Sequence, residues 1–415
     1  MSNQGMPSEV RSLAVGVTMA GLLTIAPAAG AQDAGAEFAA ALRDGDVGLA
    51  FRYRFELVDQ GGLDADANAS TLRTRLTYNS AAFRDFSLLA EMDDLRPLGA
   101  DSFNSTRNGK TTRPVVADPK ATDLNQFAVR YSGFTDTSVL LGRQRINRAN
   151  QRFIGGVGWR QNEQTYDALS VGHTFSDRLQ GYYSHVTNVN RVFGPNSGSP
   201  AGDLRTSSHL LEASYNWTPE ATVTGYGYFL DFDDAPALSN RTLGVRLTGT
   251  LTFGEDLTFP YAAEYAIQDD HANNPTGYDA DYVLLEGGFR WSNFGIKLSY
   301  EVLEGSGVAG RAFQTPLATL HPFQGWADKF LSTPDTGIED LYLSFTARGF
   351  GADFTVVYHD FSAEIGGADH GDEIDMSASW RLGDNYSLLL KLANYSADTF
   401  ATDTEKAWVM LSASF

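Results

Sequence analysis

The sequence predicts an all-β protein, a transmembrane antiparallel β-barrel of about 18 strands, and three observations support this prediction. Apolar and polar residues alternate along most of the chain, as in residues 47–57, where the odd positions are apolar. Charged residues stand in the middle of segments whose other face is apolar, which fits a water-filled lumen inside and lipid outside. Aromatic residues such as Trp217, Trp291 and Trp380 lie near segment ends, as in the aromatic girdles of membrane barrels.

The composition narrows the class of protein further. The chain has 415 residues, with 51 acidic residues against 31 Lys and Arg and a formal net charge of -20, which argues against a nucleic-acid partner. It contains no Cys, so thiolate metal sites and Cys nucleophiles are excluded. Beyond roughly the first thirty residues, no apolar run reaches the ~20 residues that a spanning helix needs, so a membrane span would have to be a barrel.

The amino terminus is expected to be an export signal. An uncharged, mostly apolar stretch ends at Pro27 and is followed by the small residues Ala29, Gly30 and Ala31, which form a cleavage box. The predicted domains are residues 1–31, a secretory signal peptide; residues 32–45, a short lead; and residues 46–415, the barrel. The protein is then expected to pass through the periplasm to the bacterial outer membrane, where its partners are lipid and lipopolysaccharide.

Strand-like segments follow one another from residue 46 to the end of the chain. At roughly 20 residues for a strand and its connection, this stretch holds about 18 strands, and 16 is an open alternative. The clearest alternating segments are residues 46–57, 72–78, 126–132, 211–217, 243–253, 294–302, 341–348, 373–382 and 407–415. The last segment ends on Phe415, an aromatic terminus that resembles the signal read by the barrel-assembly machinery of bacterial outer membranes.

Short turn signals alternate with longer connections that are polar or rich in Gly and Pro. We place the short turns on the periplasmic side and the long loops on the extracellular side. The short turns fall near residues 79–81, 135–137, 176–177, 218–220, 254–256, 292–293, 349–350 and 383–385. The longer connections fall near residues 60–68, 95–123, 147–165, 189–207, 233–240, 269–279, 304–336, 362–371 and 396–403. An apolar patch at residues 316–323 is expected to fold into the lumen or to pack on the rim.

Arginine is concentrated in the first third of the predicted barrel. The parity of the alternation points these side chains toward the lumen, with Gln144 on the opposite parity: Arg52, Arg54, Arg73, Arg75, Arg130, Arg143 and Arg145. The connection that follows adds Arg148, Arg152 and Arg160. Guanidinium groups bind carboxylates bidentately, and rings of Arg make a pore favour anions. The arginines therefore indicate an anion path.

A second interpretation of the same arginines is that they pair with acidic groups across the wall and only hold the barrel open. The candidate acidic partners are Glu56, Glu91, Asp93, Glu212, Glu264, Glu286, Glu301, Glu373 and Asp375. Charges in the lumen tune selectivity in either case. The sequence leaves both interpretations open.

No cofactor and no enzymatic activity are predicted. Acidic loop clusters could bind Ca²⁺, but none matches the spaced loop of an EF-hand. The glycine-rich turn at residues 155–158 does not sit between a strand and a helix, as a phosphate-binding loop would. The seven His residues form neither a zinc motif nor a nucleophile elbow.

Three adjacent stretches carry a resemblance to a known family. Residues 141–147 read LGRQRIN, residues 150–155 read NQRFIG, and residues 159–167 read WRQNEQTYD. With these stretches the chain resembles the alginate-export family of outer-membrane porins. The resemblance implies an arginine-lined, 18-stranded barrel that passes an anionic uronic-acid polysaccharide, or in some members smaller solutes. It also implies that Arg143, Arg145, Arg152 and Arg160 line the constriction and that Asn147, Asn150 and Gln151 hydrogen-bond sugar hydroxyls.

The leading prediction is a passive outer-membrane porin for anionic saccharides or small organic anions. The chain departs from the family pattern in its acidic balance, which puts alginate itself in doubt as the solute. A weakly selective general porin is the first alternative. A plugged barrel with a hydrolytic or adhesive role is the second, with the connections 95–123 and 304–336 as candidate plugs.

Overall fold

The structure, a computed structural model, describes residues 31–415. Apart from Ala31, the predicted signal peptide lies outside the described residues. One α-helix, α1 (Ala31–Arg43), precedes 18 β-strands. The strands are β1 (Asp46–Gln60), β2 (Ala67–Asn79), β3 (Phe86–Ser102), β4 (Ala121–Tyr131), β5 (Thr137–Gln144), β6 (Thr165–Ser176), β7 (Leu179–Asn190), β8 (Asp203–Thr218), β9 (Ala221–Leu230), β10 (Asn240–Phe253), β11 (Leu257–Asp270), β12 (Asp279–Trp291), β13 (Phe294–Leu303), β14 (Ile338–Gly349), β15 (Ala352–Ser362), β16 (Asp369–Leu382), β17 (Tyr386–Ala397) and β18 (Thr404–Ser414). A 3₁₀ helix, η2 (Pro236–Leu238), lies between β9 and β10.

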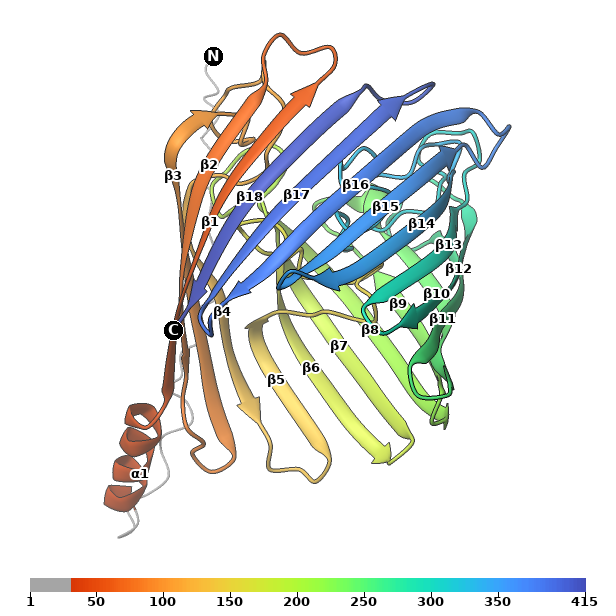
Figure 1. Cartoon of the computed structure of the whole chain (residues 1–415). Coiled ribbons are helices and arrows are strands. Elements are labelled where there is room, and N and C mark those ends of the chain that lie inside the picture. Colours follow the sequence, from red (N-terminus) through yellow and green to blue (C-terminus); the bar gives the residue numbers. More distant parts are fainter. Residues whose placement is uncertain (1–30) are drawn as a thin grey trace, which may run out of the picture.

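The strands form one closed antiparallel barrel (Figure 1). Each strand pairs with its neighbours in sequence, and β1 also pairs with β18, where Phe51 lies opposite Ala413. Closure leaves no sheet edge unpaired, which is what a sheet in a bilayer requires. The terminal Phe415 exchanges two backbone hydrogen bonds with Leu49 at this seam. The predicted fold class is confirmed, with 18 strands rather than 16.

Short turns join the strands at one end of the barrel, and long loops join them at the other end (Figure 1). In outer-membrane barrels these are the periplasmic and extracellular ends, respectively. The third connection differs from its expected span of 95–123, because β3 continues to Ser102 and the loop runs only over residues 103–120. Pro97 and Gly99 suggested a loop, but this segment pairs with β2 across a register shift between Ala69 and Thr71.

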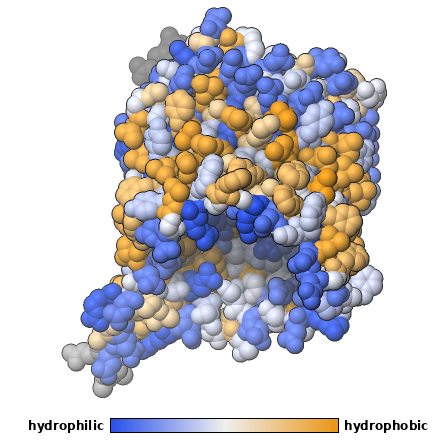
Figure 2. Space-filling model, in the orientation of Figure 1, coloured by the Kyte–Doolittle hydropathy of each residue, from blue (hydrophilic) through white to orange (hydrophobic). Residues whose placement is uncertain are grey.

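The outer wall carries an apolar band (Figure 2). Its side chains come from the alternating positions that face away from the lumen, and many are exposed on the isolated chain, such as Leu141, Trp217 and Leu298. Contiguous exposed apolar surface of this extent fits contact with lipid. No helix among residues 31–415 is long and apolar enough to cross a membrane.

Helix α1 lies at the turn end of the barrel (Figure 1) and was expected only as a short lead. It is rich in Ala, the residue with the highest helix propensity. The helix is held to the barrel by the ring of Phe38, which lies 5.5 Å from the ring of Phe83 in an edge-on arrangement. The carbonyl of Ala41 also accepts a hydrogen bond of 3.0 Å from the backbone N–H of Ala81.

Two loops, residues 145–164 and 304–337, pack together inside the barrel. The N–H of Gly155 donates to the carbonyl of Leu317 at 2.8 Å, which joins the loops edge to edge. Phe153 is buried against wall residues, with its ring 5.1 Å from that of Tyr282. These contacts form an apolar core within the lumen. The apolar patch at residues 316–323 therefore folds into the lumen, one of the two places expected for it.

Candidate functional site

The first two strands present four arginines to the lumen. Apolar residues of β1 and β2 point outward, so the alternate positions, Arg52 and Arg54 on β1 and Arg73 and Arg75 on β2, point inward. The register places Arg52 directly opposite Arg73. Like charges opposite one another destabilise a strand pair unless other groups offset them.

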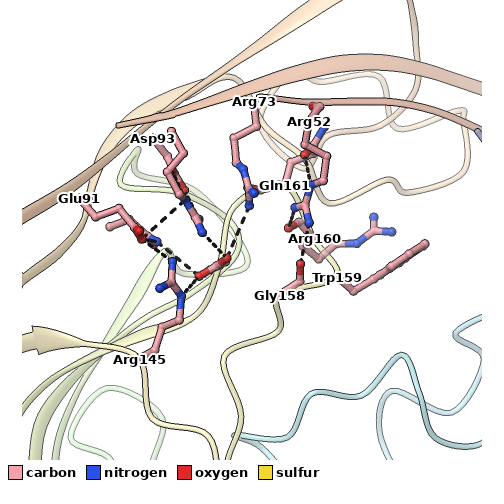
Figure 3. Close-up of polar contacts among 12 residues, drawn as sticks. Arg52, Arg73, Glu91, Asp93, Arg145, Gly158, Trp159, Arg160 and Gln161 are labelled. Carbon is pink, nitrogen blue, oxygen red and sulfur yellow. Dashed lines mark hydrogen bonds and ion pairs between the residues drawn. The ribbon is translucent and has the colours of Figure 1, made fainter. Parts of the chain in front are cut away.

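The 145–164 loop brings further charged groups to this wall. Arg145 directly follows β5, and Arg160 and Glu163 lie just before β6. Arg145 and Arg160 lie beside the arginines of β1 and β2 (Figure 3), and Glu163 pairs with Arg75 at 2.8 Å. We call the resulting group of guanidinium side chains the arginine cluster: Arg52, Arg54, Arg73, Arg75, Arg145 and Arg160. It joins one wall of the barrel to a loop that occupies the lumen.

Carboxylates offset most of the charge of the arginine cluster. The clearest pair is a bidentate one on the wall, in which Nε and Nη2 of Arg75 donate to the two oxygens of Asp93 at 2.7 and 2.6 Å. Arg160 donates to Glu56 at 3.0 Å, and Arg54 pairs with Asp118 at 3.3 Å. The five carboxylates that pair with the cluster are Glu56, Glu91, Asp93, Asp118 and Glu163.

Arg52 is the exception in the cluster. Its Nε donates to Oε1 of Gln161 at 2.8 Å, its Nη1 donates to the carbonyl of Gly158 at 2.8 Å, and its Nη2 donates to the carbonyl of Arg160. All three acceptors are neutral. Within residues 31–415, Arg52 forms no ion pair, so six guanidinium groups face five carboxylates and Arg52 carries the excess positive charge.

Glu163 links three arginines of the cluster. It pairs with Arg145, with Arg75 at 2.8 Å and with Arg73 at 3.5 Å. Burial by itself would raise the pKa of Glu163, but the charges of Arg75 and Arg145 outweigh it and lower the pKa to about 2. Glu163 is therefore ionised over the whole physiological pH range.

Asp118 has a similar role beside β1. Its carboxylate pairs with Arg54 and accepts a hydrogen bond of 2.8 Å from the backbone N–H of Gln161. Burial opposes ionisation, yet Arg160 and Arg54 lower the pKa of Asp118 below its usual value. The charges of Glu56 and Asp118 raise the pKa of Arg160 against the effect of its burial.

Arg148 and Arg152 lie elsewhere in the lumen. Arg152 is almost fully buried and donates to Glu301 of β13 at 2.7 Å and to Gln324 of the second loop at 2.9 Å. Arg148 donates to Glu212 of β8 at 2.8 Å. Each thus ties the 145–164 loop to a different part of the wall, and neither joins the arginine cluster.

The three amides expected to bind sugar hydroxyls hydrogen-bond within the two lumen loops. The side-chain oxygen of Asn147 accepts from the N–H of Gly156 at 2.7 Å, and that of Asn150 accepts from the N–H of Arg152 at 3.3 Å. Gln151 accepts from the hydroxyl of Thr319 at 2.8 Å. Their role toward a sugar stays a prediction.

Arg143 does not face the lumen, contrary to the expectation from parity. Arg143 lies opposite Phe127 in the β4–β5 register, and two positions earlier Leu141 is exposed on the outer wall. Residues on the same side of a strand alternate, so Arg143 shares the outer face with Leu141. Its Nε donates to Asp167 of β6 at 2.8 Å.

Gln144 takes the inward position instead. It is buried, and its side-chain amide donates to the carbonyl of Ala168 at 2.9 Å. The expectation for this pair was wrong because residues 139–141 are consecutive apolar residues, so the alternation gives no local sign of which parity faces lipid. Arg130 faces the lumen near the turn end, where its Nη1 donates to the hydroxyl of Ser138 at 3.5 Å.

Lys391 of β17 was not identified from the sequence. Its Nζ lies 3.5 Å from the ring centre of Trp326, 4.4 Å from that of Trp159 and 5.5 Å from that of Trp408, so cation–π attraction replaces an ion pair. The same Nζ donates to Nε2 of His321 at 2.6 Å. These residues come from two loops and two strands, and no sequence spacing relates them.

Cavities lie at both ends of this packed region. One of about 850 Å³ opens at the loop end and has Trp159 and Arg160 in its lining. Another, of about 340 Å³, lies toward the turn end and has Arg148 and Glu212 in its lining. No group of three or more His, Asp or Glu side chains within residues 31–415 is placed to hold a metal ion.

The barrel is similar to solved outer-membrane porins. OpdK of Pseudomonas aeruginosa with vanillate has a TM-score of 0.70 at 12% identity, with 90% of this chain and 99% of that chain covered. OccAB2 of Acinetobacter baumannii has a TM-score of 0.70 at 14% identity, with 91% and 99% covered. OccK9 (OpdG) of Pseudomonas aeruginosa has a TM-score of 0.69 at 15% identity, with 90% and 99% covered. At such low identity these similarities concern the fold.

Comparison of the amino-acid sequence identifies a family as well as a fold. No curated protein matches the chain, but a family model does. The family described as alginate export matches residues 44–319, which is more than half of the chain and includes the arginine cluster and the 145–164 loop. The chain therefore belongs to the alginate-export family of outer-membrane porins.

Proposed function

We propose that the protein is a passive outer-membrane channel for small organic anions and short anionic saccharides, and that the arginine cluster sets its preference for anions. The observation that carries the proposal is the charge balance at the narrowed lumen. Six guanidinium groups meet five carboxylates there, and Arg52 makes hydrogen bonds only to neutral acceptors.

The mechanism is electrostatic. An anion that enters a narrow passage loses hydration, and a nearby uncompensated guanidinium lowers that cost, since charges attract more strongly where water is scarce. An anion can replace the neutral acceptors as the hydrogen-bond partner of Arg52. No carboxylate then loses its counter-ion, because the displaced groups carry no charge. The surrounding carboxylates keep the anion from binding so tightly that it cannot leave.

The occupied lumen supports small solutes rather than a wide, general opening. The 145–164 and 304–337 loops both lie within the barrel and contact walls on different sides, through pairs such as Arg152 with Glu301. A barrel of 18 strands would otherwise leave a broad aqueous channel. We also propose that the aromatic residue Phe415, which hydrogen-bonds Leu49 beside the seam of β1 and β18, is read by the barrel-assembly machinery.

Recordings in planar bilayers test this function. Reversal potentials under a KCl gradient measure the permeability ratio of chloride to potassium, and oligouronates are compared with neutral oligosaccharides of equal length as blockers. We expect anion selectivity in the native protein and a clear loss of it in Arg52→Gln. Arg143→Gln is the matched control, because Arg143 lies on the outer wall and its removal should leave the ratio unchanged.

Three results would contradict the proposal. A native channel that is unselective or cation-selective and is indifferent to uronates would be a general porin whose arginines are structural. A protein without conductance would be a plugged barrel. An equal loss of selectivity in Arg52→Gln and Arg143→Gln would refute the assignment of the cluster.

A further inference from the structure

The cavity of about 850 Å³ at the loop end has the size of a binding site for one small molecule. Its lining comes mainly from four loops, residues 103–120, 145–164, 191–202 and 304–337. We call it the vestibule. Arg160 belongs both to its lining and to the arginine cluster, so a solute that entered from outside would meet the vestibule before the cluster.

The walls of the vestibule are mainly apolar. More than half of the lining residues are apolar, and three of them, Val115, Leu331 and Leu63, are 51%, 51% and 36% exposed. Phe193 and Trp159 add aromatic surface. Each Å² of apolar surface removed from water stabilises a complex by about 25 cal/mol, whereas a hydroxyl group placed against such walls loses hydrogen bonds to water. The walls therefore favour a solute with an apolar body over a sugar.

The charged groups of the vestibule are mostly cationic. Its only carboxylate among the described lining residues, Asp328, is already engaged, since Lys406 donates to it at 2.7 Å and His321 at 2.8 Å. The cations of the lining are Arg113, Arg160, Arg191, Lys329 and Lys406. An anion in the vestibule thus meets a clear excess of positive charge.

Three of these cations have no acidic partner. Within residues 31–415, Arg113, Arg191 and Lys329 form no ion pair. Arg113 donates to the backbone carbonyl of Asp66, and Arg191 donates to that of Ala201 at 3.2 Å while it lies 4.7 Å from the ring centre of Phe193. The ammonium group of Lys329 donates to the hydroxyl of Thr404 at 2.6 Å. A guanidinium has five N–H donors and an ammonium three, so each retains donors for a ligand.

The pKa values of two of these groups are lowered. Burial and the nearby charge of Lys406 together lower the pKa of Lys329 to about 8, although the charges of Glu373, Asp328 and Asp403 act in the opposite direction. Burial and the charge of Arg107 lower the pKa of Arg191. A bound carboxylate in direct contact with either group would raise that group's pKa and favour its charged form.

We propose that the vestibule is a binding site for small amphipathic carboxylates, in which the carboxylate pairs with Lys329 or Arg191 and an apolar body packs on Leu331 and Phe193. This inference rests on the proposed function and narrows it, because it names the class of organic anion that the channel captures before the constriction. The apolar walls and the unpaired cations together disfavour two simpler ligands. A polyhydroxylated anion would pair with the cations but gain little from the apolar walls, and a neutral apolar molecule would pack on the walls without pairing with the cations.

Isothermal titration calorimetry on the full-length protein in lipid nanodiscs tests the proposal, with empty nanodiscs as the blank. Three probes separate charge from apolar character: benzoate, glucuronate with the same charge, and benzyl alcohol with the same ring. We expect benzoate to bind at least tenfold more tightly than either of the others. Glucuronate that binds as tightly as benzoate, or no binding of benzoate, would overturn the proposal.

Two variants locate the site. Lys329→Gln and Leu331→Asn should each weaken benzoate binding severalfold, and the exposed position of Leu331 makes that variant safe for folding. Lys110→Gln is the control, because Lys110 lies in the 103–120 loop, pairs with Asp101 and is outside the lining. Unchanged affinity in both test variants would overturn the assignment.

The vestibule site and the proposed function can fail independently of each other. An anion-selective channel that binds no benzoate keeps the function and refutes the vestibule site. Benzoate binding that depends on Lys329, in a channel without anion selectivity, keeps the site and refutes the function.

Discussion

Replacing Glu163 by glutamine removes the carboxylate that links three arginines of the cluster. Glu163 pairs with Arg73, Arg75 and Arg145, and it lies in the loop that narrows the lumen. The substitution keeps the size of the side chain and one hydrogen-bond acceptor but removes the charge. It leaves six guanidinium groups facing four carboxylates and frees part of the hydrogen-bonding capacity of Arg145.

The pKa of Glu163 sets the size of the effect. A fall from the usual value of 4.5 to about 2 corresponds to about 3 kcal/mol in favour of the ionised form in the folded protein. Because the folded pKa is the lower one, this contribution is fully present above pH 4.5 and is lost as the pH falls toward 2. At pH 7 the substitution should therefore lower the free energy of unfolding by up to about 3 kcal/mol, and by less where glutamine keeps a hydrogen bond.

Two measurements test the change in selectivity and the change in stability. Reversal potentials should shift toward the chloride potential in Glu163→Gln, because the cluster gains one net positive charge. Urea unfolding followed by tryptophan fluorescence should show reduced stability at pH 7 and a smaller difference from the native protein near pH 3. Asp94→Asn is the control, since Asp94 pairs with Arg96 outside the lumen and both side chains are exposed.

A chloride permeability that is unchanged or reduced in Glu163→Gln, while the protein remains folded, would contradict this prediction. A shift of the same size in Asp94→Asn would also contradict it, because the effect would then come from overall charge and not from the cluster.

Three further predictions concern the second loop. Deletion of residues 310–328 should raise single-channel conductance severalfold, and unchanged conductance would show that this loop does not narrow the pore. Gly325→Ala should lower the melting temperature and increase current fluctuations, because Gly325 has φ +80° and an added Cβ would lie 2.3 Å from Glu373. Gly307→Ala has a similar backbone strain at φ +70° but nothing within 4 Å, so it should lower the melting temperature less and leave the current fluctuations unchanged. Benzoate affinity should fall as the pH rises through about 8, where Lys329 loses its proton, and Lys329→Gln should show no such fall.

The local pattern of the chain was sufficient to predict the barrel. Side chains of a strand point alternately to its two faces, and turns have their own residue preferences, so the approximate strand number and the faces of β1 and β2 follow from neighbouring residues. The choice of 18 strands over 16 was left to the structure. The inward positions of Arg52, Arg54, Arg73 and Arg75 were predicted for this reason. Helix α1 was not, although its Ala-rich sequence suits a helix.

Tertiary structure decided what lies inside the barrel. Arg143 and Gln144 follow three consecutive apolar residues, so only pairing with β4 shows which of them faces lipid. Arg152 meets Glu301 across 149 positions of the sequence, and Lys391 meets three tryptophans from separate segments. A sequence shows which charges exist, but their pairing depends on which loops enter the lumen. That choice is made by long-range contacts, such as the pairing of Gly155 with Leu317, that no local period encodes.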